Sequence, residues 1–166
     1  MISPHQHGFL FKLSTCTQLL ETIYDWPLSL RNRHVVDVVY FDFCKAFDSV
    51  SHVKLSQKLS AYGLSGPLFS FLTDFLNDRY QKVVFRYGSS SFIPVTSGVP
   101  QESVLSSVLF LIYINDISDK FCSNVTLSLF ADDIKIYMEL TFDDSDRELQ
   151  NGIDCIVHWS STWQLN

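Results

Sequence analysis

The stretch of sequence that decides the fold is Val-Val-Asp-Val-Val-Tyr-Phe-Asp-Phe, residues 35–43. It is short, rich in β-branched and aromatic residues and almost continuously apolar, which is typical of a strand buried within a sheet. Asp42 adds a carboxylate at the end of this apolar run. The stretch therefore predicts a buried strand that ends in an acidic side chain.

Two helices are predicted after this strand. The first carries Leu55, Leu59 and Tyr62 on one face and ends at Gly63, a residue type that commonly follows the last turn of a helix. The second begins after Ser65-Gly66-Pro67. Its apolar residues recur at the i, i+3, i+4, i+7 and i+8 positions of an amphipathic helix, namely Leu68, Phe71, Leu72, Phe75 and Leu76.

Two hairpins and two further helices complete the predicted order of elements. Runs of alternating or apolar residues separated by short polar turns indicate the hairpins. The order of strand, helices, hairpin, helix, hairpin and helix predicts an α+β fold, with helices on one face of an antiparallel sheet. The predicted ranges are a hairpin of 81–87 and 92–96 with its turn at 88–91, a helix to about 115, a hairpin of 125–130 and 134–140 with its turn at 131–133, and a helix over about 145–163.

Composition limits the classes to which the chain can belong. Of its 166 residues 46% are hydrophobic and 18% charged, which supports one folded domain and excludes intrinsic disorder. The longest apolar run, residues 108–114, is far shorter than the ~18 residues of a membrane-spanning helix. Cys16, Cys44, Cys122 and Cys155 form no C-x-x-C pair, which argues against zinc and against a secreted disulfide framework. We therefore expect an intracellular protein, cytoplasmic or nuclear. Its net charge of −6 gives it no general attraction for nucleic acid, so any binding of nucleic acid must come from a local groove.

Three carboxylates carry the candidate chemistry. Asp132 and Asp133 lie in the turn of a hydrophobic hairpin, and strand ends and turns at one sheet edge can bring them together with Asp42. Carboxylates that share a site repel one another unless a divalent cation neutralises them, and oxygen ligands on a rigid sheet suit Mg²⁺. Two such ions about 4 Å apart would activate an attacking oxygen and stabilise the leaving one. The alternative is that Asp132 and Asp133 are ordinary turn residues, although tight turns usually favour a glycine that is absent here.

Several segments, taken in order, resemble the motifs of reverse transcriptases from non-LTR retrotransposons of the LINE and jockey type. The similarity extends over nearly the whole chain and lies in both the order and the spacing of the motifs. The segments are Tyr-Phe-Asp-Phe-Cys-Lys-Ala-Phe-Asp-Ser-Val at 40–50 (motif A), Ser-Gly-Val-Pro-Gln-Glu-Ser-Val-Leu at 97–105 (motif B), Phe-Ala-Asp-Asp at 130–133 (motif C), Gln-His-Gly-Phe at 6–9 with Ser14-Thr15 (upstream fingers motif), and Tyr-Ile-Asn-Asp at 113–116 with Trp159 and Trp-Gln-Leu-Asn at 163–166 (further signatures).

The resemblance implies a right-hand polymerase. Residues 1–34 would be a remnant of the fingers and 35–166 the palm, a ferredoxin-like antiparallel sheet with helices on one face, with a fingers insertion at about 65–100 and no thumb. The implied reaction is RNA-directed DNA synthesis, in which a primer 3′-hydroxyl attacks the α-phosphate of a dNTP. The implied cofactor is a pair of Mg²⁺ ions, with Mn²⁺ as the substitute, and the implied partners are an RNA template and a DNA primer.

The same resemblance assigns roles to individual residues. Asp42, Asp132 and Asp133 would be catalytic and would hold the metal ions. Phe43, Phe47, Gln101 and Lys12 would contact the nucleotide, with Phe47 as the steric gate against a 2′-hydroxyl and Lys12 as the cation for the triphosphate. Taken singly, each also has a structural interpretation, since Phe47 could be a core residue and Gln101 a residue at a helix start.

The chain departs from the family pattern at positions expected to touch substrate. Glu102 replaces the glycine after the motif B glutamine, and any side chain there intrudes on a close backbone approach. Ser106 and Ser107 replace the usual Gly-Pro, and Leu13 replaces an arginine whose bidentate phosphate contacts Lys12 cannot fully reproduce. These departures predict weak or absent activity of the chain on its own.

Two alternatives remain beside the polymerase hypothesis. The first is a catalytically inactive, decayed or co-opted palm that acts as a binding module and self-associates through the surface left by a missing thumb. The second is a metal-dependent phosphohydrolase with Asp42 as nucleophile. It is disfavoured because Cys44 stands where an Asp-x-Asp strand end would have its second acid.

Overall fold

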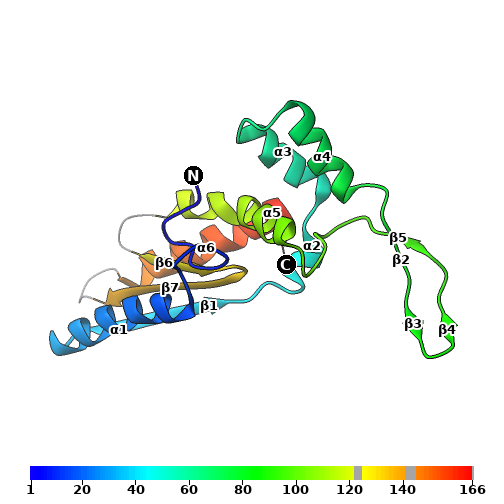
Figure 1. Cartoon of the computed structure of the whole chain (residues 1–166). Coiled ribbons are helices and arrows are strands. Elements are labelled where there is room, and N and C mark those ends of the chain that lie inside the picture. Colours follow the sequence, from blue (N-terminus) through cyan, green and yellow to red (C-terminus); the bar gives the residue numbers. More distant parts are fainter. Residues whose placement is uncertain (122–124, 141–144, 166) are drawn as a thin grey trace. The chain divides into compact units, whose positions relative to one another are not determined.

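The computed structural model describes residues 1–121, 125–140 and 145–165, so Cys122 and Asn166 of the sequence analysis lie outside it. The chain divides into two compact units (Figure 1). The first unit combines Met1–Cys44 with Ile114–Asn166, and the second is Lys45–Tyr113. The candidate carboxylates all belong to the first unit, whereas Phe47 and Gln101 belong to the second.

The first unit is built on a three-stranded antiparallel sheet in the order β1–β7–β6. β1 (Val35–Phe41) pairs with β7 (Asp133–Leu140) along its whole length, and Phe41 lies opposite Ile134. β6 (Thr126–Phe130) pairs with β7 on its other side. The predicted strand at 35–43 and the predicted hairpin at 125–130 and 134–140 are confirmed to within two residues at each end.

β1 lies at the edge of this sheet, which corrects the prediction of a strand buried within it. Val35 is 59% exposed and Tyr40 70%, and exposed and half-buried positions alternate along most of the strand. A continuous apolar run does not reveal whether a strand is central or at an edge, because both positions favour β-branched and aromatic residues.

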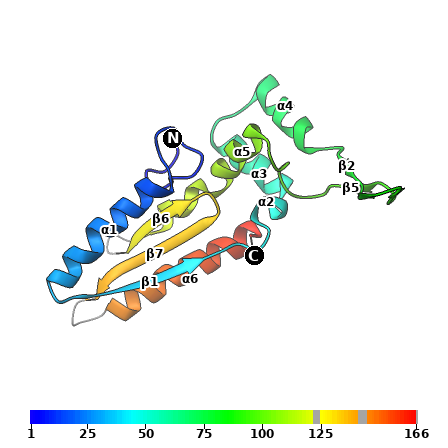
Figure 2. The ribbon, with the colours of Figure 1, turned by 60° about the horizontal axis from the view of Figure 1, so that its bottom comes forward.

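Helices cover both faces of the sheet, which corrects the expectation of helices on one face (Figure 2). α6 (Ser145–Trp163) packs on β7, where a Cβ added to Gly152 would lie 3.4 Å from Ile136 Cδ1. α1 (Thr15–Arg31) packs on the opposite face, where Gln18 Nε2 donates to Ser128 Oγ at 2.9 Å. Because side chains alternate between the faces of a strand, even-numbered residues of β7 face α6 and odd-numbered residues face α1.

The layer between α1 and the sheet is polar. Lys135 is buried, its Nζ donates to Thr22 Oγ1, and burial lowers the pKa of its ammonium group. Tyr137 donates its hydroxyl proton to Asp25 Oδ2 at 2.5 Å, and burial followed by this carboxylate raises the pKa of the phenol well above its usual range. The opposite face is apolar, with Ile136 fully buried.

The apolar side of α1 therefore faces away from the sheet. Ser14 caps the helix by accepting a hydrogen bond from the Thr17 amide, while Thr17 Oγ1 accepts one from the Ser14 amide. The exposed apolar residues of the helix are Leu19, Leu20, Ile23, Tyr24, Leu28 and Leu30.

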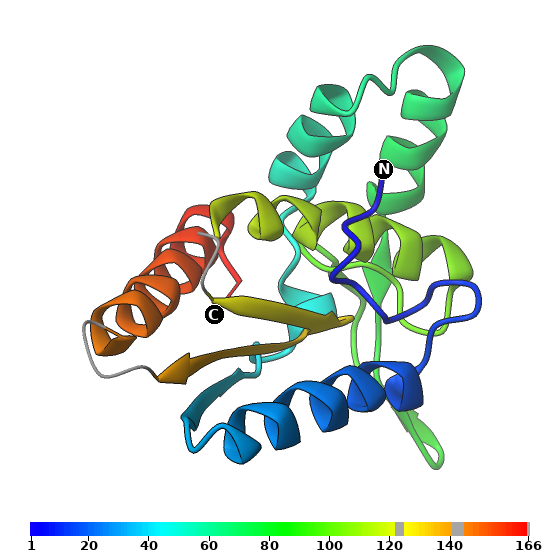
Figure 3. The same ribbon diagram turned by 90° about the vertical axis from the view of Figure 1, so that its left-hand side faces the viewer.

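The second unit contains the helical hairpin predicted from the sequence (Figure 3). After the short α2 (Ala46–Ser49) come α3 (His52–Ala61) and α4 (Gly66–Leu76), which pack on each other. The buried side chains of these two helices include Leu55, Leu59, Leu72 and Leu76. α3 is followed by Gly63 at φ +83°, as its sequence predicted.

A long exposed hairpin follows α4, and its turn corrects the sequence prediction. β2 (Tyr80–Gln81) pairs with β5 (Ile93–Pro94), and β3 (Val84–Phe85) pairs with β4 (Gly88–Ser89). We call residues 79–95 the outer hairpin. Its turn lies at Arg86–Tyr87 rather than at 88–91, because Arg86 adopts φ +50° and Gly88 pairs within the ladder.

The remaining elements follow the predicted pattern. α5 (Val104–Ile114) is strongly apolar and continues into the 3₁₀ helix η1 (Asn115–Lys120). α6 begins and ends at the predicted residues. Among the described residues, no helix is both long enough and apolar enough to span a membrane.

Candidate active site

The sheet brings the three predicted carboxylates to one edge. Asp42 directly follows β1, and the pairing of Phe41 with Ile134 continues the register to place Asp42 beside Asp133. Asp132 occupies the turn between β6 and β7, which consists of Ala131 and Asp132 because Phe130 pairs with Asp133. Residues from distant parts of the sequence therefore meet at one site of the first unit.

The electrostatics of Asp132 show that these acids interact. Its pKa is raised above the usual value, chiefly because burial disfavours the charged form, and further because Asp133 and Asp42 repel its charge. A hydrogen bond from the backbone acts in the opposite direction. Burial is thus the main cause of the raised pKa, and the smaller repulsion by Asp133 and Asp42 indicates that the three carboxylates lie close enough to interact.

The donor set fits magnesium only if other ligands complete it. In residues 1–121, 125–140 and 145–165, no group of three or more His, Cys, Asp or Glu side chains is arranged to hold a metal ion. Mg²⁺ does not require such a cage, since it is commonly bound by one or two carboxylates together with water and substrate phosphates. Asp42 and Asp132 offer oxygen ligands of that kind at the sheet edge.

The turn that carries Asp132 is held by residues near the start of the chain. Gln6 is 2% exposed, and its Oε1 accepts hydrogen bonds from the amides of Gly8, at 2.7 Å, and Ala131, at 2.8 Å. Its Nε2 donates to the Ala131 carbonyl at 3.3 Å. One buried side chain thereby satisfies both backbone groups of the residue that precedes Asp132.

Gly8 completes this support because nothing larger fits there. A Cβ on Gly8 would lie 2.3 Å from the Ala131 amide nitrogen, so the backbones touch directly. The neighbouring amide of His7 donates to the Leu129 carbonyl at 2.8 Å, which attaches the segment to β6. The family resemblance assigns Gln6 and Gly8 to the fingers, whereas in the structure they support the turn of Asp132.

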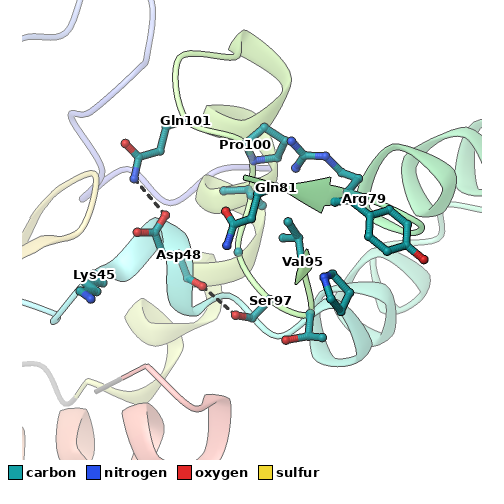
Figure 4. A pocket seen from close by; sticks show the side chains of 13 residues that line it. Lys45, Asp48, Arg79, Gln81, Val95, Ser97, Pro100 and Gln101 are labelled. Carbon is teal, nitrogen blue, oxygen red and sulfur yellow. Dashed lines mark hydrogen bonds between the residues drawn. The ribbon is translucent and has the colours of Figure 1, made fainter. Parts of the chain in front are cut away.

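The second unit contains a polar cavity of about 570 Å³ around Gln101 (Figure 4). Gln101 Nε2 donates to Asp48 Oδ1 at 2.9 Å, and Ser97 Oγ donates to the Asp48 carbonyl at 2.9 Å. Gly98 has φ +87°, and a Cβ there would lie 2.8 Å from Asp48 Cα. Asp48 thus ties the segment after β1 to the loop that carries Gln101.

Two cations line this cavity, Lys45 and Arg79, and neither was among the predicted nucleotide-binding residues. Lys45 lies within the motif A segment but had only the signal of a surface charge, and Arg79 has no motif of its own. The predicted cation, Lys12, is exposed in the first unit, with its Nζ 5.4 Å from the centre of the Phe11 ring.

The two aromatic candidates differ in their surroundings. Phe47 is half-buried and stacks on Phe110, with ring centres 4.3 Å apart and planes at 14°. Phe43 is only 6% exposed and packs against Trp159, with ring centres 6.2 Å apart. The ring of Phe43 is therefore a core group, and the predicted contact of this residue with the nucleotide stays a prediction.

The positions that depart from the family pattern have clear local consequences. Glu102 is exposed and has φ +61°, a conformation in which glycine is far less strained than other residues. Ser106 is buried, and within the described part of the chain its hydroxyl has no hydrogen-bond partner. Ser107 is half-buried, and Leu13 is exposed.

Comparison with known proteins gives the family. Residues 1–166 match the family described as "Reverse transcriptase (RNA-dependent DNA polymerase)". The chain is 28% identical over 169 residues to the probable RNA-directed DNA polymerase from transposon X-element of Drosophila melanogaster, which covers 99% of this chain and 18% of that protein. It is 27% identical over 172 residues to the RNA-directed DNA polymerase from mobile element jockey of Drosophila funebris, with 99% and 19% covered. The chain thus spans about a fifth of the length of these curated relatives.

Solved structures support the same fold. Telomerase from Candida tropicalis, in complex with a fragment of telomeric RNA, superposes with a TM-score of 0.64 at 13% identity, covering 90% of this chain and 27% of that one. The fold is therefore α+β and of the polymerase palm type. Because the family match extends over residues 1–166, the chain belongs to the reverse transcriptase (RNA-dependent DNA polymerase) family.

Proposed function

We propose that this chain is the catalytic segment of an RNA-directed DNA polymerase of a mobile element. The reaction would be attack of a primer 3′-hydroxyl on the α-phosphate of a dNTP along an RNA template, with release of pyrophosphate. The observation that carries the proposal is the meeting of Asp42, Asp132 and Asp133 at one sheet edge, where their charges interact. The relatives of this chain are RNA-directed DNA polymerases of transposons, which supports the same reaction.

Asp42 and Asp132 would hold Mg²⁺ jointly with substrate phosphates, with Asp133 beside them. When bound, such ions activate the attacking hydroxyl and neutralise charge on the leaving pyrophosphate. The chain itself contributes rigid placement, since Gln6 and Gly8 hold the turn of Asp132. Preorganised charge of this kind is a large part of catalysis in phosphoryl and nucleotidyl transfer.

The second unit would supply the nucleotide contacts. Stacking on Phe110 holds the ring of Phe47, which would exclude a ribose 2′-hydroxyl. The hydrogen bond to Asp48 fixes the amide of Gln101, whose Oε1 remains as an acceptor for substrate. Lys45 and Arg79 give the cavity the positive charge that phosphate groups require, and we propose them ahead of Lys12.

We further propose that residues 1–34 and about 65–100 correspond to the fingers and the rest to the palm. One exception lies in residues 6–8, which support the palm turn by the contacts described above. α4 and the outer hairpin would make up most of the fingers insertion.

Primer extension tests the proposal. Purified chain is given a primed RNA template, dNTPs and Mg²⁺, and Asp132→Asn is compared with Asp74→Asn, an exposed acid of α4. We expect weak extension that falls by at least about 100-fold in Asp132→Asn and is unchanged in Asp74→Asn. Extension that survives Asp132→Asn would remove the carboxylates from the mechanism.

A second candidate function is a non-catalytic binding module that self-associates. The exposed apolar side of α1 favours it, because contiguous apolar surface of that kind usually marks an interaction site. Sedimentation at increasing concentration distinguishes the two. A monomer at every concentration excludes self-association, whereas dimerisation that Leu20→Glu with Ile23→Glu abolishes would support it.

A further inference from the structure

The outer hairpin has a charge opposite to that of the whole chain. Residues 79–95 contain no Asp or Glu but include Arg79, Lys82 and Arg86, a formal charge of +3. The chain as a whole carries −6. A local positive field in an acidic protein attracts a polyanion to that segment and to little else.

The hairpin also exposes aromatic rings. Tyr80, Phe85, Tyr87 and Phe92 are all largely exposed, Phe85 by 70% and Tyr87 completely. Its strands pair over only two residues each, and every residue from 80 to 94 is exposed. These rings therefore belong to no hydrophobic core of their own and are accessible to a ligand.

Cations and rings are presented together. Lys82 Nζ lies 5.0 Å from the centre of the Phe92 ring, and Arg86 Cζ lies 5.3 Å from the centre of the Phe85 ring. A surface that places aromatic faces next to ammonium and guanidinium groups matches a strand of unpaired nucleotides, whose bases stack while its phosphates pair with the cations. Paired bases cannot stack in this way, so a duplex is a poorer fit.

The base of the hairpin is continuous with the cavity around Gln101. Arg79, Tyr80 and Gln81 line that cavity together with Lys45 (Figure 4). The Val95 amide donates to the Arg79 carbonyl at 2.8 Å, which fixes the base of the hairpin. Positive charge thus extends from the exposed rings to the proposed nucleotide contacts within a single unit.

We propose that the outer hairpin binds single-stranded RNA and leads it toward the cavity of Gln101. The assignment of that strand as the template rests on the proposed function, whereas binding of RNA to the hairpin does not. Pairing with the hairpin of a second copy is a poorer alternative, because two hairpins of charge +3 repel each other. The apolar side of α1 exposes a single aromatic ring, that of Tyr24, and serves as the internal comparison.

Fluorescence anisotropy with a labelled 20-nucleotide oligouridylate, without metal or dNTP, tests the inference. Tyr87→Ala and Phe85→Ala should each weaken binding about 5- to 150-fold, the range expected for loss of one base stack, while Tyr87→Trp should retain it. Lys82→Ala with Arg86→Ala should flatten the slope of log affinity against log salt by about 0.7 for each phosphate that is no longer neutralised. Tyr24→Ala and Arg31→Ala on α1, also an exposed tyrosine and an exposed arginine, should change neither quantity.

The inference is overturned if Tyr87→Ala binds the oligouridylate like Tyr24→Ala, or if duplex RNA or oligothymidylate binds more tightly. It is likewise overturned if the chain binds no RNA and Tyr87→Ala instead abolishes self-association. The hairpin would then be an interface between two copies of the chain. Because the assay needs no catalysis, a chain that fails in primer extension can still confirm it. Conversely, Asp132→Asn could abolish primer extension while Tyr87→Ala changes neither extension nor RNA binding. That result would refute RNA binding by the hairpin and leave the proposed catalytic function intact.

Discussion

Two tight hairpin turns of this protein have similar backbones and opposite surroundings. The turn Ala131–Asp132 and the turn Arg86–Tyr87 each contain two residues, lack glycine and begin with a residue at positive φ, +54° for Ala131 and +50° for Arg86. The first is enclosed by the start of the chain and joins strands with buried side chains, whereas the second is fully exposed. Turn geometry alone therefore does not make a site, because the surrounding contacts decide whether the turn is held in place.

The largest effect should come from Gly8→Ala. Its new methyl group would lie 2.3 Å from the Ala131 amide nitrogen, so the backbone of the Asp132 turn must move. We expect a loss of about 3 kcal/mol or more in the free energy of unfolding, measured by urea denaturation. Gly88→Ala, beside the other turn, is the matched control, because its nearest atom would be the Phe85 carbonyl oxygen at 3.8 Å. Equal losses in the two variants would show that the Asp132 turn has no special support.

Loss of the Gln6 side chain should have the next largest effect. Gln6→Ala leaves the buried Ala131 amide without its acceptor, for which we expect a cost of about 1–3 kcal/mol. The comparable change in the outer hairpin is Ser90→Ala, since Ser90 Oγ accepts from the Val83 amide at 2.9 Å on an exposed surface. Water can replace that acceptor, so the free energy of unfolding should change by less than about 0.5 kcal/mol. Thermal and urea unfolding of both variants measure the difference.

The sequence predicted those features that depend on local pattern. β1, β6, β7 and α6 were located to within two residues, because their apolar periodicity is regular and their ends carry ordinary turn residues. The meeting of Asp42 with Asp132 also followed from strand ends, since an antiparallel register brings the end of one strand to the start of another.

Other features depend on contacts that no local pattern contains. The support of Ala131 by Gln6 joins residues 125 positions apart, and although each lies in a recognised motif, neither local pattern indicates that the two are in contact. The docking of α1 through Gln18, Thr22 and Ser29 contradicts the rule that a helix buries its apolar side. The turn at Arg86 was misplaced because Gly88 and the serines after it have stronger turn propensity than an arginine at positive φ.

Tyr137→Phe tests a second support of the enclosed turn, because Tyr137 anchors β7 to α1. At pH 7 we expect a cost of about 1–2 kcal/mol from loss of the hydrogen bond to Asp25, measured by urea denaturation, against less than about 0.5 kcal/mol for Tyr87→Phe in the outer hairpin. Burial raises the pKa of Tyr137, so the folded chain keeps the phenol proton at a pH where the unfolded chain loses it. The contribution of Tyr137 to the free energy of unfolding is therefore complete below pH ~10 and is lost as the pH rises above that value. Tyr137→Phe should remove that alkaline loss, and an unchanged slope above pH ~10 would contradict the proposed anchoring.

The smallest effect should come from placing glycine at each turn. A non-glycine residue at positive φ is strained by about 1–2 kcal/mol, and glycine relieves this strain but makes the unfolded chain more flexible by roughly 0.5–1 kcal/mol. Arg86→Gly should therefore gain about 0.5 kcal/mol in the free energy of unfolding. Ala131→Gly gains the same amount but loses the methyl group of a residue that is only 5% exposed, worth about 0.8 kcal/mol, so its net change should be near zero or slightly negative. Urea denaturation of the two variants in parallel resolves the difference, and equal gains at both turns would mean that the Ala131 methyl group contributes nothing to the packing that holds Asp132.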